Sequence, residues 1–406
     1  MPSYRRLPFA AALGVLLTAC VAYRPAPVSA PSLVATAATP PAGPLAFDDA
    51  VRFGVTNNPE LRALRARIGA INTSPGPEPI GISAEYDMDG RWGGAISLDA
   101  LSLLGIGPRK AERALRWARR DEAVRVHHER ARDVAGEIAE AYAVERALAS
   151  LPEVDVHVAA EAYVRAGLES GAAQGAVEAT AGEWQAERTA REAERRTNRR
   201  ALRRLLGARP DGEIAIVAPA ADWPALPAPS EATLLAARAD LQTRLAAYEV
   251  ADAELRSAVA AQYPGIEIEP GIAFDPSALF GGVRLRLPVG ADREAVAAEC
   301  AREAARQDLL AAILDALEDA AAAREEADVA ARRVAAARVR AKSSEDVLRT
   351  AKARLEAGSG MLLEAVFAAR EVVMAAADLR EAEVEAARTR VRAARAAGWP
   401  GPEVVR

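Results

Sequence analysis

The chain has 406 residues, a formal net charge of −5, three histidines and two cysteines. Hydrophobic residues make up 51% of it and aromatic residues only 4%, so alanine and the aliphatic residues supply most of the apolar surface. Two cysteines exclude a disulfide scaffold, the negative charge argues against nucleic-acid binding, and 27% charged residues argue against a bundle of transmembrane helices.

Residues 1–19 have the organisation of a lipoprotein signal peptide. Arg5 and Arg6 precede the apolar run Leu7–Leu17, which is shorter than the roughly 20 residues that span a bilayer. The sequence Leu17-Thr18-Ala19-Cys20 resembles a bacterial lipobox, in which cleavage precedes the cysteine and a lipid is attached to its thiol. The alternative is an ordinary secretory signal with an unrelated cysteine.

Residues 20–44 are rich in Pro, Ala and Ser and predict a lipidated, flexible N-terminal tether. If Cys20 carries lipid, Cys300 has no thiol partner in the chain, and we expect it to be a small core residue.

The rest of the chain contains an internal duplication. Three markers recur in the same order at nearly constant offset: Pro59-Glu60-Leu61 with Ala239-Asp240-Leu241, Trp92–Ile96 with Phe280–Arg284, and Leu168–Gly171 with Leu355–Gly358. Each repeat is predicted to contain a short helix, two strands, a long helix, a glycine turn and a second long helix. The predicted domains are a first repeat at 45–207, a connector at 208–229 with one short strand at Ile214–Val217, a second repeat at 230–397 and a tail at 398–406.

Two pairs of strands are predicted, at about 80–103 and about 266–289. Ile266–Glu269 and Val283–Leu287 alternate apolar and polar residues, as strands do, and each segment has roughly the 9–11 residues of a tilted transmembrane strand. Aromatic residues in or beside the segments are candidate membrane-interface anchors: Tyr86, Trp92, Tyr263, Phe274 and Phe280. The alternative is a pair of soluble hairpins whose aromatic residues lie in the core.

Helical hairpins are predicted at about 108–206 and about 291–397. Asp292–Glu356 contains neither proline nor glycine, so it predicts one helix about 100 Å long. Gly358-Ser359-Gly360 ends that helix, and Leu362–Ala397 returns. In the first repeat, Pro152 is expected to kink or split the long helix, because proline removes a backbone hydrogen bond.

Four strands cannot close a barrel, and open sheet edges are not tolerated in lipid. Protomers must therefore combine their strands: three copies give 3 × 4 = 12 strands around a lumen, whereas two give eight, whose interior side chains fill. The predicted fold is mainly α with a small β part. The duplicated repeat would form a long antiparallel α-helical barrel, and four strands per protomer would join a trimeric 12-stranded transmembrane β-barrel.

The order of these elements and several segments resemble the TolC family of outer-membrane efflux proteins, in its lipoprotein subgroup. The segments are Ala50-Val51, Asn57–Leu61, Tyr263–Ile266 and Gly282–Pro288. The resemblance implies a homotrimer, lipid-anchored in the bacterial outer membrane and extending into the periplasm. It also implies two partners, a periplasmic adaptor (membrane fusion) protein and an inner-membrane transporter. The implied function is passive conduction in a tripartite efflux pump of the RND type or in a type I secretion system.

The resemblance also implies that the hairpin tips dock the adaptor through an Arg-x-x-x-Gly motif. Arg354 and Gly358 fit the motif, whereas in the first repeat Gly171 matches but Gly167 stands in place of the arginine. Glu169 and Glu356 lie near the turns and are candidate tunnel-mouth acids that would favour cations. Hydrated surface glutamates are the alternative interpretation.

No pattern of catalytic residues is present. His127 and His128 are adjacent, so on a helix they point about 100° apart and cannot bind one metal ion together. Gly105–Pro108 is too short for a phosphate loop, and no nucleophile–base arrangement is recognisable. We therefore predict no enzyme activity, metal or cofactor.

One other class of function remains open. The chain could be a lipid-anchored periplasmic coiled-coil scaffold that forms no channel, and whether the four predicted strands enter a membrane discriminates between the two functions.

Overall fold

A computed structural model describes residues 35, 37–40, 43–73, 80–86, 92–99, 108–150, 171–209, 212, 214–216, 231–263, 265–274, 277–286 and 291–399. The chain divides into two units, Met1–Ala37 and Ala38–Arg406. Nearly all of the first unit, including Cys20, lies outside the described residues, so the fold is that of the second unit.

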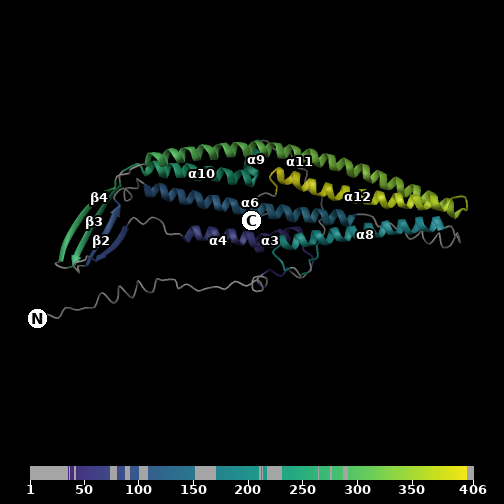
Figure 1. Cartoon of the computed structure of the whole chain (residues 1–406), viewed down its shortest axis with the longest axis horizontal. Coiled ribbons are helices and arrows are strands. Elements are labelled where there is room, and N and C mark those ends of the chain that lie inside the picture. The colour runs from purple at the N-terminus through teal and green to yellow at the C-terminus, as the bar shows by residue number, and fades with distance from the viewer. Residues whose placement is uncertain are drawn as a thin grey trace. The chain divides into compact units, whose positions relative to one another are not determined.

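The second unit is mainly helical, and the same order of elements occurs twice (Figure 1). The first series is α3 (Phe47–Asn57), α4 (Pro59–Thr73), β1 (Ile80–Tyr86), β2 (Trp92–Asp99), α6 (Pro108–Ser150) and α8 (Gly171–Leu205). The second series is α9 (Glu231–Ala237), α10 (Ala239–Ala260), β3 (Gly265–Phe274), β4 (Ser277–Arg286), α11 (Ala291–Glu356) and α12 (Leu362–Ala396). Each series thus starts with two short helices rather than the one predicted.

The four strands form one antiparallel sheet in the order β1-β2-β3-β4. β1 and β2 pair from Ile80 opposite Leu98 to Tyr86 opposite Trp92, and β3 pairs with β4 along its whole length. The middle pair, β2 with β3, joins the two repeats. β1 and β4 are therefore the edge strands, and the sheet lies beyond the ends of α6, α10 and α11 (Figure 1).

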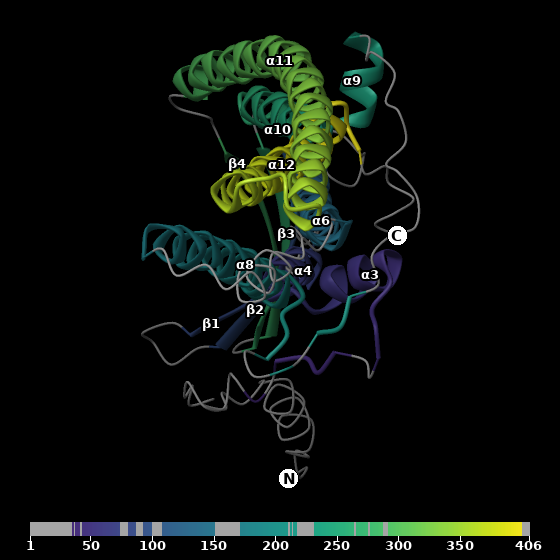
Figure 2. The ribbon, with the colours of Figure 1, turned by 90° about the vertical axis from the view of Figure 1, so that its right-hand side faces the viewer.

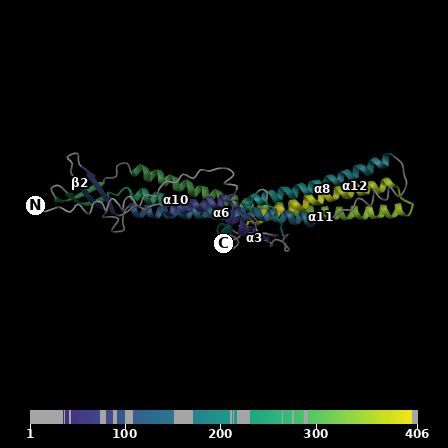
Figure 3. The same ribbon diagram turned by 90° about the horizontal axis from the view of Figure 1, so that it is seen from below.

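Next to the sheet, the helices pack in the order α4, α6, α10, α11 (Figure 2). α6 and α10 are antiparallel, because Arg119 pairs with Glu254 at 2.9 Å and Arg125 donates to Gln242 at 2.7 Å. Farther from the sheet, α8 and α12 take over as neighbours of α6 and α11 (Figure 3). Among the described residues, none of the helices is both long and apolar enough to cross a membrane.

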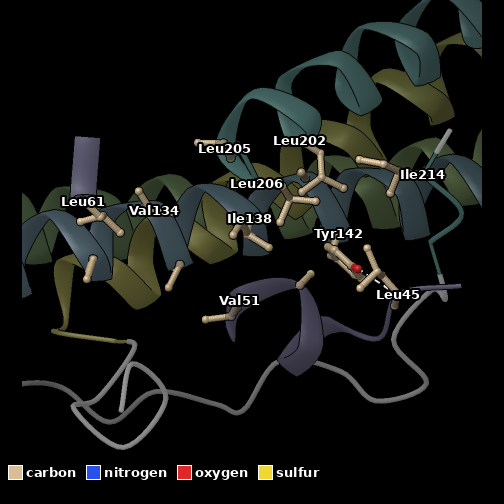
Figure 4. Close-up of a cluster of buried hydrophobic side chains, with 14 residues drawn as sticks. Leu45, Val51, Leu61, Val134, Ile138, Tyr142, Leu202, Leu205, Leu206 and Ile214 are labelled. Carbon is tan, nitrogen blue, oxygen red and sulfur yellow. Dashed lines mark hydrogen bonds between the residues drawn. The ribbon is translucent and has the colours of Figure 1, made fainter. Parts of the chain in front are cut away.

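The largest apolar core lies where α3, α4, α6 and α8 meet (Figure 4). Its fully buried side chains include Leu61, Ile138 and Leu202, and the Tyr142 hydroxyl donates to the Leu45 carbonyl at 2.8 Å. Burial raises the pKa of Tyr142, so the phenol stays protonated as a donor.

Asn58, in the Asn57–Leu61 segment that resembles the TolC family, has a clear structural role. Its side-chain oxygen accepts from the backbone N–H groups of Glu60 at 2.9 Å and Leu61 at 3.3 Å, so it caps α4, and Pro59 occupies the first helical position. The Asn58 amide also donates to the Leu205 carbonyl at 3.0 Å. This buried residue therefore fixes the α3–α4 junction to the end of α8.

Some predictions from the sequence differ from the structure, and one falls outside the described residues. The prediction that Cys300 is a core residue is wrong: Cys300 is exposed on α11, because this helix is covered on one face only. Among the described residues of the Ile214–Val217 segment, the only pairing is an isolated bridge between Ile216 and Leu45. α6 ends at Ser150, and Pro152 lies outside the described residues.

Candidate functional site

The turn between α11 and α12 is closed by backbone hydrogen bonds around Arg354 and Gly358. The Ser359 N–H donates to the Arg354 carbonyl, and the Gly358 N–H donates to the Leu355 carbonyl, each at 3.0 Å. These two bonds define a Schellman C-cap, which needs a left-handed residue directly after the helix. Gly358 supplies it, with φ +69°.

A second glycine is required two residues later. The Gly360 N–H also donates to the Arg354 carbonyl at 3.0 Å, and a Cβ added at Gly360 would come within 2.8 Å of the Leu355 nitrogen. Within the described residues, the Arg354 side chain forms only a long ion pair of 3.4 Å with Glu364, and both side chains are exposed. The Arg354-x-x-x-Gly358 motif therefore shapes the turn through its backbone and leaves the Arg354 guanidinium accessible.

Both hairpins contribute helices beneath this turn. Leu362 and Val366 of α12 are buried against Ala176 and Val177 of α8. The first turns of α8 and α12 therefore lie side by side, as Figure 3 also shows. Gly171 is the first residue of α8, whereas Glu169 and Gly167 lie outside the described residues. Glu356 is exposed at the last turn of α11.

The start of α12 also exposes apolar side chains, which the sequence analysis missed. Met361 is 69% exposed and Phe367 58%, and Leu363 and Met374 are exposed as well. Leu363, Phe367 and Met374 share one helix face, opposite the buried face of α12. We call these four residues the tip ledge. Their spacing places three of them on one helix face, but α12 also carries apolar residues on its packed face, so the spacing alone does not identify the exposed one.

α8 and α12 are joined mainly by arginine–glutamate pairs. Arg370 binds Glu183 at 2.8 Å, and Arg380 binds Glu187 at 2.6 Å and Glu194 at 2.8 Å. Burial alone would lower the pKa of Arg380, but the hydrogen bonds and charges of the two glutamates outweigh burial and raise it. Arg380 therefore remains a cation between the two repeats.

The predicted interface aromatics fall at two levels of the sheet. Tyr86 and Trp92 are paired at the loop end of the first hairpin, and Phe274 ends β3 at the loop end of the second. Phe280 lies on β4 opposite Gly271, three residues from that end, whereas Tyr263 precedes β3 at the helical end and is 64% exposed. Ten residues of β3 separate the two levels, which corresponds to roughly 30 Å, close to the thickness of a bilayer core.

α11 has a second apolar face that no described part of the chain covers. At 100° per residue, its exposed large apolar side chains lie within about 100° of the helix surface, opposite the face that packs on α12. These residues are Val296, Leu310, Leu314, Val329, Val339 and Val347, and we call them the α11 stripe. On α4, at the other edge of the helical layer, Ala63, Ala66 and Ala70 form an exposed row of small residues.

The described residues contain no group of three or more potential metal ligands. His127 is half-buried, and its Nε2 accepts from Arg65 Nε at 3.2 Å. The pKa of His127 is lowered, chiefly by burial and to a lesser extent by the charges of Arg65 and His128. His127 therefore takes part in a contact between α4 and α6, and His157 lies outside the described residues.

Comparison with known proteins identifies the fold. No family model and no curated protein matches the chain. Among solved structures, the outer-membrane channel OprN aligns with a TM-score of 0.68 and 19% identity, over 87% of this chain and 89% of OprN. The MtrE outer-membrane channel of Neisseria gonorrhoeae, in its open state, aligns with a TM-score of 0.66 and 18% identity, over 87% and 88%. The outer-membrane protein VceC of Vibrio cholerae aligns with a TM-score of 0.64 and 17% identity, over 87% and 96%.

The chain therefore has the mainly helical fold of outer-membrane channels. The resemblance to the TolC family is confirmed at the level of the fold, and so is the helical part of the predicted fold class. The 12-stranded barrel, the domain bounds and the site residues remain predictions.

Proposed function

We propose that the chain is a subunit of a passive outer-membrane channel, the exit component of a tripartite efflux pump or of a type I secretion system. The single observation that carries this proposal is a four-stranded sheet with two open edges beside helices with an uncovered apolar face. Both features are unfavourable in an isolated protomer, because edge strands leave backbone N–H and C=O groups unpaired and large apolar surfaces are exposed to water. Both would be satisfied by identical neighbours.

Cyclic assembly would place the α11 edge of one protomer against the α4 edge of the next. Large side chains of the α11 stripe, such as Leu310 and Leu314, would pack against the small residues of α4, and close helix packing favours this combination. The same rotation would join β4 to the next β1. Three protomers then give 3 × 4 = 12 strands and a lumen, from four strands in each protomer.

The assembly is tested by placing charges on the α11 stripe. We expect Leu310→Glu combined with Leu314→Glu to convert a trimer into monomers and to abolish conductance in planar bilayers. The matched control is Ala297→Glu with Ala301→Glu, at exposed positions of the same helix outside the stripe, and it should remain trimeric. A wild-type protein that is monomeric and conducts no ions would overturn the channel and would favour the lipid-anchored scaffold.

The partners follow from the same proposal. The tips, with Arg354, Gly358 and Gly171, would dock a periplasmic adaptor protein, and the inner-membrane transporter would supply the energy. Lipid on Cys20 and the interface aromatics would hold the trimer in the outer membrane. The tip ledge is a suitable surface for such a partner, because exposed apolar patches mark interaction sites.

Glu356 is proposed to line the tunnel mouth, where a trimer would hold three carboxylates. A ring of negative charge favours cations, so Glu356→Gln should reduce the cation preference of single channels by several-fold. Glu345→Gln, another exposed glutamate of α11 farther from the turn, is the control. Unchanged ion selectivity in Glu356→Gln would assign Glu356 to the hydrated surface.

A further inference from the structure

The first turns of α6 carry several cations that form no ion pair within the described part of the chain. Lys110 and Arg113 are exposed, and neither forms an ion pair within the described part of the chain. The Nε atoms of Arg116 and Arg120 are buried without a hydrogen-bond acceptor. Of the cations between residues 110 and 120, Arg119 alone forms an ion pair with another described residue, Glu254. A buried guanidinium N–H without an acceptor is costly, and the positive charge on this surface is not balanced by ion pairs, so the surface is suited to an anion.

An exposed tryptophan lies among these cations. Trp117 is 56% exposed, and the guanidinium carbon of Arg120 lies 5.2 Å from the centre of its ring. On a helix, residues 110, 113, 117 and 120 share one face. An indole combines an apolar body with a polar N–H group, and tryptophan is enriched where a membrane meets water.

This face lies at the sheet end of the helices. Arg119 pairs with Glu254, and Arg302 pairs with Asp252 at 3.6 Å, so the start of α6, the end of α10 and the start of α11 are at one level. Exposed Tyr263, at the end of α10, lies at the same level. Helical side chains tilt toward the N-terminus of their helix, which in α6 is the end beside the sheet (Figure 1).

The second repeat differs at the equivalent position. Residues 108–120 contain six basic residues and one acidic residue, a net charge of 6 − 1 = +5. The first 13 residues of α11, 291–303, contain two basic and four acidic residues, a net charge of 2 − 4 = −2. The positive charge is therefore a property of the start of α6 that the equivalent helix of the second repeat, α11, does not share.

We propose that the basic face of α6, formed by Lys110, Arg113, Trp117 and Arg120, binds the anionic headgroups of phospholipids in the leaflet nearest the helices. The proposal rests on the channel function, because only an inserted sheet brings a bilayer to this level. Arginine forks match phosphate oxygens, clustered cations are attracted to anionic leaflets, and long basic side chains extend their charge toward the headgroups. The acidic start of α11 would confine binding to one sector of each protomer.

The test counts lipids on the purified full-length trimer by native mass spectrometry, after addition of equimolar phosphatidylglycerol and phosphatidylethanolamine. We expect a preference for phosphatidylglycerol, which Lys110→Gln with Arg113→Gln lowers by about tenfold or more. The matched control, Arg293→Gln with Arg306→Gln, removes two exposed cations from α11 and should keep the preference. Lys110→Arg with Arg113→Lys retains both charges and should also keep it.

Three outcomes would overturn the proposal. They are equal retention of both lipids by the wild type, an undiminished preference in the Lys110/Arg113 glutamine variant, and complete displacement by inorganic phosphate, which would identify a free-anion site. Each can be distinguished from failure of the channel proposal, because the same preparation is checked for trimers and for conductance. A conducting trimer without lipid preference refutes the lipid site alone.

Discussion

The two repeats build similar hairpins with different interfaces. In the first repeat, α6 and α8 meet at Glu145, which is 3% exposed and accepts hydrogen bonds from Arg195 at 2.7 Å and Arg199 at 2.8 Å. On either side of Glu145, the Leu148 carbonyl accepts from Arg191 at 2.6 Å and the Ala141 carbonyl accepts from Asn198 at 2.8 Å. Long polar side chains of α8 thus bind the last turns of α6.

In the second repeat, α11 and α12 meet along a seam of small and branched residues. Its buried members near the turn are Leu348, Ala351, Ala365, Ala368, Ala369 and Val372. Charged pairs, such as Arg338 with Glu383, lie at the margin, and Arg338 is 64% exposed there. The comparison shows that the second helix of each hairpin has the same length, 35 residues in both α8 and α12, although the chemistry of the two seams differs.

The largest expected effect follows from the buried acid of the first repeat. Glu145→Ala leaves Arg195 and Arg199 without their common acceptor, and removing one partner of a buried pair is strongly destabilising. Because both arginines are partly exposed, we expect a loss of about 2–3 kcal/mol in the free energy of unfolding, measured by urea titration of the helical circular dichroism. Glu383→Ala in the second repeat should cost less than about 1 kcal/mol.

Equal losses in Glu145→Ala and Glu383→Ala would contradict this comparison. Burial alone would raise the pKa of Glu145, but Arg199 and Arg195 outweigh burial and lower it. A depressed carboxyl pKa contributes stability above its unfolded value of 4.5 and loses it as the pH falls through the folded value. Glu145→Gln should therefore flatten the stability profile below about pH 4.5.

These interfaces show which parts of the fold could be predicted from the sequence. The α11 helix was predictable because 65 residues without Pro or Gly, Asp292–Glu356, leave no place for it to end. The α9–α10 break was missed because Arg238 interrupts the helix without glycine or proline, whereas Pro59 directly after Asn58 is a signal for the α3–α4 break that was not used. The Glu145 network joins residues 50 and 54 positions apart, and on evenly charged helices no local pattern selects one glutamate from many.

The candidate site was predictable in part. Gly358 could be identified because a left-handed C-cap requires glycine, whereas the burial of Cys300 was predicted wrongly. On a long alanine-rich helix, cysteine occurs on a covered or an uncovered face with the same sequence pattern, and α11 is covered on one side only. The tip ledge depends on where α12 packs, which the hydrophobic spacing alone left ambiguous.

A smaller effect separates the two tips. Gly358→Ala places a Cβ on a residue with φ +69°, which should lower the stability of the α11–α12 hairpin by about 1 kcal/mol. Gly171→Ala is the matched control, because Gly171 lies in α8 and has no positive φ, and alanine favours a helix. Thermal unfolding measures both variants, and an equal loss in both would mean that the second tip is not defined by its C-cap.

The smallest effect concerns the histidines, all three of which lie in the first repeat. Since the pKa of His127 is lowered from 6.5, the neutral form is favoured in the folded state, where Nε2 accepts from Arg65. As the pH falls below about 6.5, the unfolded chain binds the proton first, so this contribution to stability is lost.

For a half-exposed contact we expect the free energy of unfolding to change by well under 1 kcal/mol between pH 7.5 and 5.5 because of this group. Thermal unfolding across this range should show a shallower slope in His127→Gln than in the wild type, whereas His128→Gln removes only the smallest of the three causes and should change the slope less. The same slope in all three proteins would exclude the α4–α6 contact as the pH-sensitive part of the first repeat.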